Sequence, residues 1–209
     1  MTTIINASSV NGITISSDTS GQIALQSNGT TVATVSAGAF SATGVTIGSY
    51  TPAASLITAG TPQTVSGTAV TFSSIPSWVK RITIMFDNIL FATADKLQLQ
   101  LVTSGGTIAT GYNSGNWLAN TVNVYGTTAF NLIAYPYNTI YFSGICTLAL
   151  LNSSTNLWAQ NAVLSSAAGA AYTTVSGGSV TLSALLTGLK LSGTSGNSFA
   201  SGSVNILYE

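Results

Sequence analysis

The sequence predicts an all-β protein in which a small N-terminal β-strand module precedes an antiparallel β-sandwich that is jelly-roll-like. Apolar side chains alternate with polar ones in many short runs, which is the period of a half-buried strand. Gly, Asn and Ser separate these runs, and no segment combines a helical period with capping residues. We therefore place the module at residues 1–48, a linker at 49–66 and the sandwich at 67–209.

The N-terminal module is predicted to contain short strands joined by tight turns. Ile23 and Leu25 alternate with polar neighbours, and Asn28-Gly29 follows them closely. This dipeptide favours a two-residue hairpin turn, because both of its residues tolerate a positive φ angle. The module offers few large apolar side chains, so it can hardly form a core of its own. We expect it to pack on partner molecules.

Residues 49–66 have the composition of a linker, since Pro52, Gly60 and Pro62 occur among Ser, Thr and Ala. All three tryptophans and seven of the eight tyrosines follow this stretch. The main hydrophobic core is therefore expected to begin near residue 67.

The clearest strand of the predicted sandwich is 80–90, in which Ile82, Ile84 and Phe86 share one face. Other runs with strand character follow it, bounded by Gly, Asn and Ser. They are residues 69–72, 97–102, 121–125, 130–133, 139–151, 157–164, 180–191 and 203–208. About eight or nine antiparallel strands with such turns indicate a sandwich of two packed sheets.

The charged residues exclude several classes of function. The chain carries four basic and four acidic side chains and no histidine, so no Ser-His-Asp or Cys-His arrangement can form. Its single cysteine cannot complete a zinc site or an internal disulfide. A net charge of zero with four cations argues against nucleic-acid binding. We expect no membrane insertion, because polar residues and Pro136 interrupt the most apolar stretch, 131–151. No signal peptide is apparent.

Asp87 and Asp95 form the closest pair of acids for carboxylate chemistry, which a glycosidase requires on both sides of the scissile bond. Lys96 follows the second acid, and Lys80-Arg81 precedes the strand that leads to the first. Exposed ion pairs and charged turn residues are common in proteins and contribute little. We therefore interpret both acids as surface or turn residues.

The remaining candidates for chemistry have simpler interpretations. Cys146 lies in an apolar alternating run and is expected to be a small buried side chain. Gly105-Gly106, Gly177-Gly178 and residues 193–196 lack the glycine spacing and the lysine of a phosphate loop, so we interpret them as turns. The sequence thus offers no catalytic, cofactor-binding or metal-binding residue.

Aromatic residues gather in a stretch rich in Asn, Gly and Thr: Tyr112, Trp117, Tyr125, Tyr135, Tyr137 and Tyr141. Rings beside amide side chains make good contact surfaces for sugars or proteins, because they combine apolar area with a polar group. The alternative is ordinary packing within the sheets and core. Both interpretations remain open at the level of the sequence.

Three stretches of the chain match recognisable patterns: residues 15–31 the opening "SDTSG-x-x-x-LQ-x-NGT", residues 70–83 the segment "F-x-x-IP-x-WVKRIT", and residues 199–209 the ending "F-x-x-GS-x-N-I-x-YE". Together they resemble bacteriophage virion proteins of the tail-fibre and capsid-decoration type, especially those of cyanophages. Ala200 departs from the pattern, since relatives often carry an acid there. The resemblance covers the two ends of the chain and the start of the sandwich. It implies a virion surface protein, usually trimeric, and carries over no catalytic residues.

The leading hypothesis is a trimeric capsid decoration (cement) protein on the virion surface, assembled in the host cytoplasm. The N-terminal module would bind the major capsid protein or another virion protein, and a cement protein stabilises the shell by binding only its assembled form. The alternative is a short tail fibre or receptor-binding tip whose exposed aromatics contact host surface glycans. A surface-acting glycosidase ranks third, because acids are scarce.

Overall fold

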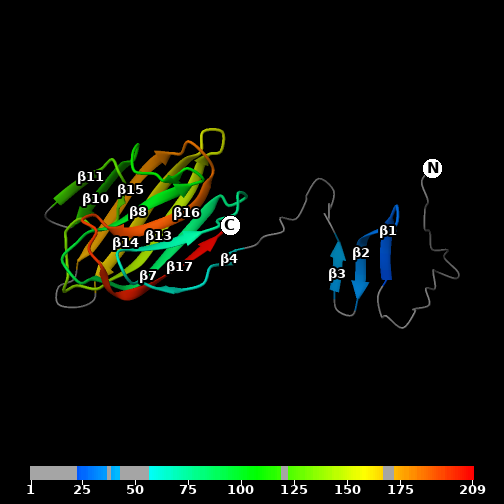
Figure 1. Cartoon of the computed structure of the whole chain (residues 1–209), viewed down its shortest axis with the longest axis horizontal. Helices are drawn as coiled ribbons and strands as arrows, with labels where there is room; N and C mark the ends of the chain where they lie inside the picture. Colours follow the sequence, from blue (N-terminus) through cyan, green and yellow to red (C-terminus); the bar gives the residue numbers. More distant parts are fainter. Residues whose placement is uncertain (1–22, 37–38, 43–56, 119–121, 167–171) are drawn as a thin grey trace. The chain divides into compact units, whose positions relative to one another are not determined.

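The computed structural model describes residues 23–36, 39–42, 57–118, 122–166 and 172–209 of the 209-residue chain. The chain divides into two compact units, residues 1–54 and 55–209. Their described residues form antiparallel sheets and contain no helix (Figure 1). The predicted all-β fold class, with sheets packed as a sandwich, is confirmed.

The first unit contains a three-stranded sheet in the order β1-β2-β3. Its strands are β1 (Ile23–Ser27), β2 (Thr30–Ser36) and β3 (Ala39–Ala42). Asn28 and Gly29 form the turn between β1 and β2 with φ angles of 52° and 77°, which confirms the predicted hairpin. The rest of the predicted N-terminal module, residues 1–22, 37–38 and 43–48, lies outside the described residues.

The second unit consists of two sheets. The strands of the larger sheet are β4 (Thr58–Ala59), β5 (Gln63–Thr64), β7 (Arg81–Phe91), β10 (Asn113–Leu118), β11 (Val122–Gly126), β13 (Phe142–Asn152), β14 (Leu157–Ser166), β15 (Thr173–Thr181) and β17 (Phe199–Tyr208). Those of the smaller sheet are β6 (Ala69–Ser73), β8 (Leu97–Thr103), β9 (Gly106–Thr107), β12 (Phe130–Asn131) and β16 (Leu186–Gly193).

The chain crosses between the two sheets repeatedly, as in a jelly roll. The smaller sheet has the order β12-β8-β16-β6, with β9 beside β8. The larger sheet has the order β11-β10-β15-β14-β13-β7-β17-β4, with β5 beside β17. The meander β13-β14-β15 widens this sheet, and the part of the sheet from β11 to β7 carries the surface described below (Figure 1).

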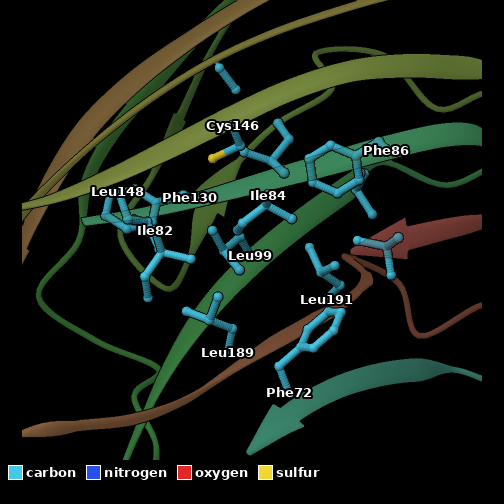
Figure 2. Packing of buried hydrophobic residues seen from close by; sticks show 14 of the residues in the cluster. Phe72, Ile82, Ile84, Phe86, Leu99, Phe130, Cys146, Leu148, Leu189 and Leu191 are labelled. Carbon is cyan, nitrogen blue, oxygen red and sulfur yellow. The ribbon is translucent and has the colours of Figure 1, made fainter. Parts of the chain in front are cut away.

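The hydrophobic core lies between the two sheets. Ile82, Ile84 and Phe86 of β7 point inward and are buried, as their alternation predicts. They face side chains of the smaller sheet, including Leu99 of β8 and Leu191 of β16 (Figure 2). Full burial of one such side chain stabilises a fold by about 1.5–3 kcal/mol. The core therefore depends on both sheets at once.

The sandwich begins earlier than the predicted boundary at residue 67. Part of the expected linker pairs with the last strand, since β4 and β5 both run antiparallel to β17. The Gly60 N–H also donates to the carbonyl of Ile206 at 2.7 Å, and Val65 is buried. Residues 57–66 thus belong to the sandwich unit, while 49–56 lie outside the described residues. The loop-like composition reflects strands of only two residues each.

Two further expectations about the sandwich are wrong. The run 180–191 is not one strand, because β15 ends at Thr181 and β16 begins at Leu186 in the other sheet. Gly177-Gly178 is not a turn but the middle of β15. A Cβ on Gly178 would collide with the carbonyl oxygen of Asn113 on β10, so close approach of two strands requires this glycine.

Candidate interaction surface

The six aromatic residues singled out in the sequence occupy three environments. Tyr112 belongs to the core, where its ring contacts Phe130 edge-on at 4.9 Å between centroids. Its hydroxyl accepts the Leu101 N–H at 2.8 Å and donates to the carbonyl of Ile108 at 3.2 Å. Burial raises the pKa of Tyr112 to about 12. This residue is therefore structural.

Trp117 and Tyr125 lie exposed on the outer face of the larger sheet, on β10 and β11. The strand register places Trp117 at one end of a line of apolar side chains that crosses five strands. This outer row consists of Trp117 (53% exposed), Val175 (43%), Val163 (48%), Ile145 (52%) and the half-buried Met85. Each member lies directly opposite the next across a strand pair, so the row is continuous.

The strands at this side of the sheet bury polar residues while they expose apolar ones. On β10, Ser114 and Asn116 are buried, whereas Trp117 is exposed. On β15, Thr174 and Ser176 are buried on either side of the exposed Val175. Because side chains alternate between faces, a shift of one residue would reverse this pattern. An exposed row of large apolar side chains over a buried polar layer reverses the usual distribution of residues between surface and interior.

Part of the buried polar layer has hydrogen-bond partners, whereas Asn116 Oδ1, Gln160 Oε1 and Thr174 Oγ1 are buried without one among the described residues. Ser114 Oγ accepts the backbone N–H of Asn131 at 3.1 Å, and Asn116 Nδ2 donates to the carbonyl of Asn131 at 3.3 Å. Gln160 Nε2 donates to Ser176 Oγ at 3.1 Å. The first two bonds tie β10 to β12, and the third ties β14 to β15. They are made in the same register that turns the apolar row outward.

Beside the outer row lies a shallow depression of about 400 Å³, which we call the glycine trough. Gly115 of β10 and Gly177 of β15 lie opposite each other in its floor, and Trp117, Tyr125 and Val175 line it. A Cβ on Gly115 would meet nothing within 4 Å, and one on Gly177 only the carbonyl of Gln160 at 3.6 Å. Neither glycine has a positive φ angle. Packing within the subunit therefore does not require them.

Tyr135, Tyr137 and Tyr141 lie in the segment between β12 and β13. The ring of Tyr137 contacts those of Tyr135, Tyr172 and Phe142 at 5.2, 5.4 and 5.6 Å between centroids. Tyr135 and Tyr141 are exposed. This tyrosine cluster is a second aromatic surface, distinct in sequence position from the outer row.

Asp95 is a buried carboxylate that organises the loop after β16. Its Oδ1 accepts hydrogen bonds from the N–H of Lys96 (2.8 Å), Thr194 Oγ1 (3.0 Å) and the N–H of Ser195 (3.0 Å). Its Oδ2 accepts from the N–H groups of Ser195 (3.2 Å) and Asn197 (3.1 Å). Burial raises the pKa of Asp95, but these hydrogen bonds outweigh it and hold the pKa below its ordinary value.

The two acids therefore occupy unlike positions. Asp87 is exposed on β7 and accepts a hydrogen bond from Asn88 Nδ2 at 3.0 Å, whereas Asp95 is 1% exposed with both oxygens already bonded. Of the two roles expected for these acids, Asp87 has the surface role and Asp95 the turn role, but Asp95 is buried rather than exposed. Arg81, the first residue of β7, forms an ion pair with Glu209 at 3.3 Å. β7 lies between β13 and β17, so it is not an edge strand of the larger sheet.

Cys146 is buried, as expected, and burial raises its pKa to about 12. In the described ranges, no three His, Cys, Asp or Glu side chains gather as a metal site would require. No helix among those residues is long and apolar enough to cross a membrane.

Sequence reasoning found Trp117 and Tyr125 but missed Ile145, Val163 and Val175. The alternation of these residues with buried neighbours was the available signal. For Val175 the signal was obscured because the interpretation of Gly177-Gly178 as a turn removed β15 from the predicted strands, whereas Ile145 and Val163 lie in predicted strands whose outward face is set by the pairing. No family model, curated protein or solved structure matches this chain.

Proposed function

We propose that this chain is a non-enzymatic structural protein of a bacteriophage virion, a trimeric decoration protein that binds and stabilises the assembled capsid. The resemblance of residues 15–31, 70–83 and 199–209 to virion proteins supports the viral assignment. The chain has no histidine, and the carboxylate of Asp95 is engaged by its own loop. These two facts favour a structural role over a catalytic one.

The outer row carries the proposal. A solitary subunit would leave Trp117, Val175, Val163 and Ile145 in water while it buries Asn116 and its polar neighbours. No charged residue occurs between Lys96 and Lys190, so the strands β10 to β15 present only neutral side chains. Free soluble domains ordinarily keep such surfaces small and charged. A neutral, partly apolar face suits a protein that works inside an assembly.

The N-terminal unit supplies the attachment to the shell. Its sheet has three strands, and the side chains of Leu25, Val32 and Val35 are exposed on it. Three strands are near the minimum for an independently stable sheet and need a covered hydrophobic face, so a partner surface over these side chains would stabilise the unit. A unit that binds only the assembled shell stabilises that shell by mass action.

Copy number on the particle tests this function. We expect gel densitometry of purified virions to give hundreds of copies per particle, and we expect removal of residues 1–48 to abolish attachment. A handful of copies would assign the chain to the tail instead. A truncated protein that still coats particles would show that the N-terminal unit is not the attachment module.

The tyrosine cluster favours a second candidate, a short tail fibre or receptor-binding tip that contacts host surface glycans. Tyr135 and Tyr141 present exposed rings beside the packed ring of Tyr137. Aromatic rings with hydroxyl groups suit neutral sugars, which have both apolar faces and polar edges. Binding of host oligosaccharides that is lost in Tyr135→Ala and Tyr141→Ala would favour this candidate. Glycan binding unchanged by both substitutions would remove it.

A further inference from the structure

We propose that a second copy of this chain covers the outer face of the larger sheet, with Trp117 of one copy lying in the glycine trough of its neighbour. This inference deepens the proposed function, because it rests on the chain acting within an assembly and names the surface and the partner. Its evidence is the outer row, the two glycines (Gly115 and Gly177) that packing within the subunit does not require, and the absence of charged residues on β10, β13, β14 and β15.

The size of the face suits a stable protein contact. Four strand spacings separate β10 from β7, or about 19 Å at 4.8 Å each, and a ten-residue strand such as β14 spans about 33 Å. The flat area is therefore about 600 Å² on each copy, near the lower end of standard protein interfaces. The apolar outer row crosses the middle of this area. The arrangement resembles the apolar centre and polar rim of known interfaces.

The chemistry of the face favours a second copy over a different protein. A surface that meets its own copy brings identical groups together, so charged side chains would repel one another across the contact. The strands β10, β13, β14 and β15 carry no charged residue at all, and β7, which borders the face, carries the exposed Arg81 and Asp87, two charges of opposite sign. A neutral face of this kind meets itself without electrostatic opposition.

The glycine trough provides the complementary shape. Gly115 and Gly177 lie in ordinary strand conformation with open space above them, although a glycine within a strand weakens it by about 0.5–1 kcal/mol relative to alanine. Glycine inside a strand often marks the close approach of another molecule. Trp117 projects from the same strand two residues from Gly115. The protruding ring and the hollow therefore lie together, so the ring of each copy can enter the hollow of the next copy around a three-fold axis.

Sedimentation equilibrium of the full chain tests this contact. We expect the wild type to associate, and we expect Trp117→Ala and Gly115→Val each to weaken association at least ten-fold. The first variant removes the ring, and the second fills the trough with a side chain that the subunit accommodates. Trp78→Ala removes another exposed tryptophan, and Thr71→Val adds the same side chain to an exposed position of the smaller sheet. Both controls should associate like the wild type.

Circular dichroism spectra and thermal unfolding of all four variants report whether the subunit remains folded. A folded wild type that stays monomeric at about 100 μM, a concentration well above the Kd of stable interfaces, overturns the inference. The inference is also overturned if the wild type associates and neither Trp117→Ala nor Gly115→Val weakens that association. A monomeric chain whose glycine trough binds a neutral oligosaccharide overturns it too. If the variants fail to associate but the chain is absent from virions, the inference stands and the proposed function fails. If the Trp117→Ala variant is monomeric in solution and still coats particles at the normal copy number, the contact between copies is not required for attachment to the particle.

Discussion

Replacement of Asp95 by Asn is expected to destabilise the sandwich strongly, although the two side chains have nearly the same shape. An amide offers one oxygen and one NH2 group where the carboxylate offers two oxygens. With its oxygen in the Oδ1 position, the new NH2 group faces the N–H groups of Ser195 and Asn197, which now donate to Oδ2. Donor then meets donor in a buried site.

The magnitude follows from these contacts. A hydrogen bond to a charged group contributes about 1.5–3 kcal/mol, and a buried donor left without a partner costs about 1–3 kcal/mol. Loss of the Asn197 bond and weakening of the Ser195 bond therefore give a total of about 3–5 kcal/mol. Asp87→Asn is the matched control, because Asp87 is exposed and its loss should change stability by no more than about 0.5 kcal/mol.

Urea unfolding followed by circular dichroism measures both effects. With a slope of about 2 kcal/mol per molar urea, Asp95→Asn should move the midpoint by about 2 M and Asp87→Asn by almost nothing. The folded state lowers the pKa of Asp95 below its ordinary value of 3.8, so its ionised form stabilises the fold above that pH. This contribution is lost as pH falls through the folded-state pKa, and Asp95→Asn should lack that acid-dependent loss. A midpoint change below about 0.5 M would refute the role given to the Asp95 hydrogen bonds.

Three other measurements probe the sandwich. Gly178→Ala should lower the free energy of unfolding by about 2–3 kcal/mol because its Cβ meets the β10 backbone, whereas Gly177→Ala, with open space, should leave it unchanged or raise it by up to about 1 kcal/mol. Equal effects of the two alanines in urea unfolding would contradict the assigned faces of β15. Cys146 should not react with a maleimide in the native protein, since burial raises its pKa to about 12, and labelling seen by mass spectrometry should require unfolding. Arg81→Ala breaks an exposed ion pair with Glu209 and should change stability by less than about 1 kcal/mol, so a larger shift in the thermal midpoint would assign this pair a greater role.

Local sequence patterns predicted most of the strands, but they did not predict which strands pair with each other. Asn28-Gly29 and the alternation Ile82-Ile84-Phe86 are complete signals within a few residues, and both appear in the structure as predicted. The two-residue strands β4 and β5 have no such period, because β17 alone recruits them. Their pairing depends on residues more than a hundred positions away, which no local pattern can reveal.

The candidate surface was only partly predictable for the same reason. Exposed aromatics are recognisable as contact residues, but the outer row exists only in the register of five strands. Gly177 and Gly178 look alike in the sequence, yet one faces open space and the other a neighbouring backbone. Asp95 likewise becomes a buried anchor only when residues 194–197 fold over it. Tertiary contacts, rather than residue type, decide these roles.

The neutrality of the strands between Lys96 and Lys190 has a further consequence for any contact that they make. Interfaces built on ion pairs weaken as ionic strength rises, because dissolved ions screen the attraction within about 10 Å at 0.1 M salt. A contact between uncharged faces has no such attraction to lose, and no counter-ions leave when it forms. Its strength depends instead on temperature, since hydrophobic association weakens on cooling. An assembly held by this face is therefore indifferent to dilution of its surrounding electrolyte and sensitive to cold.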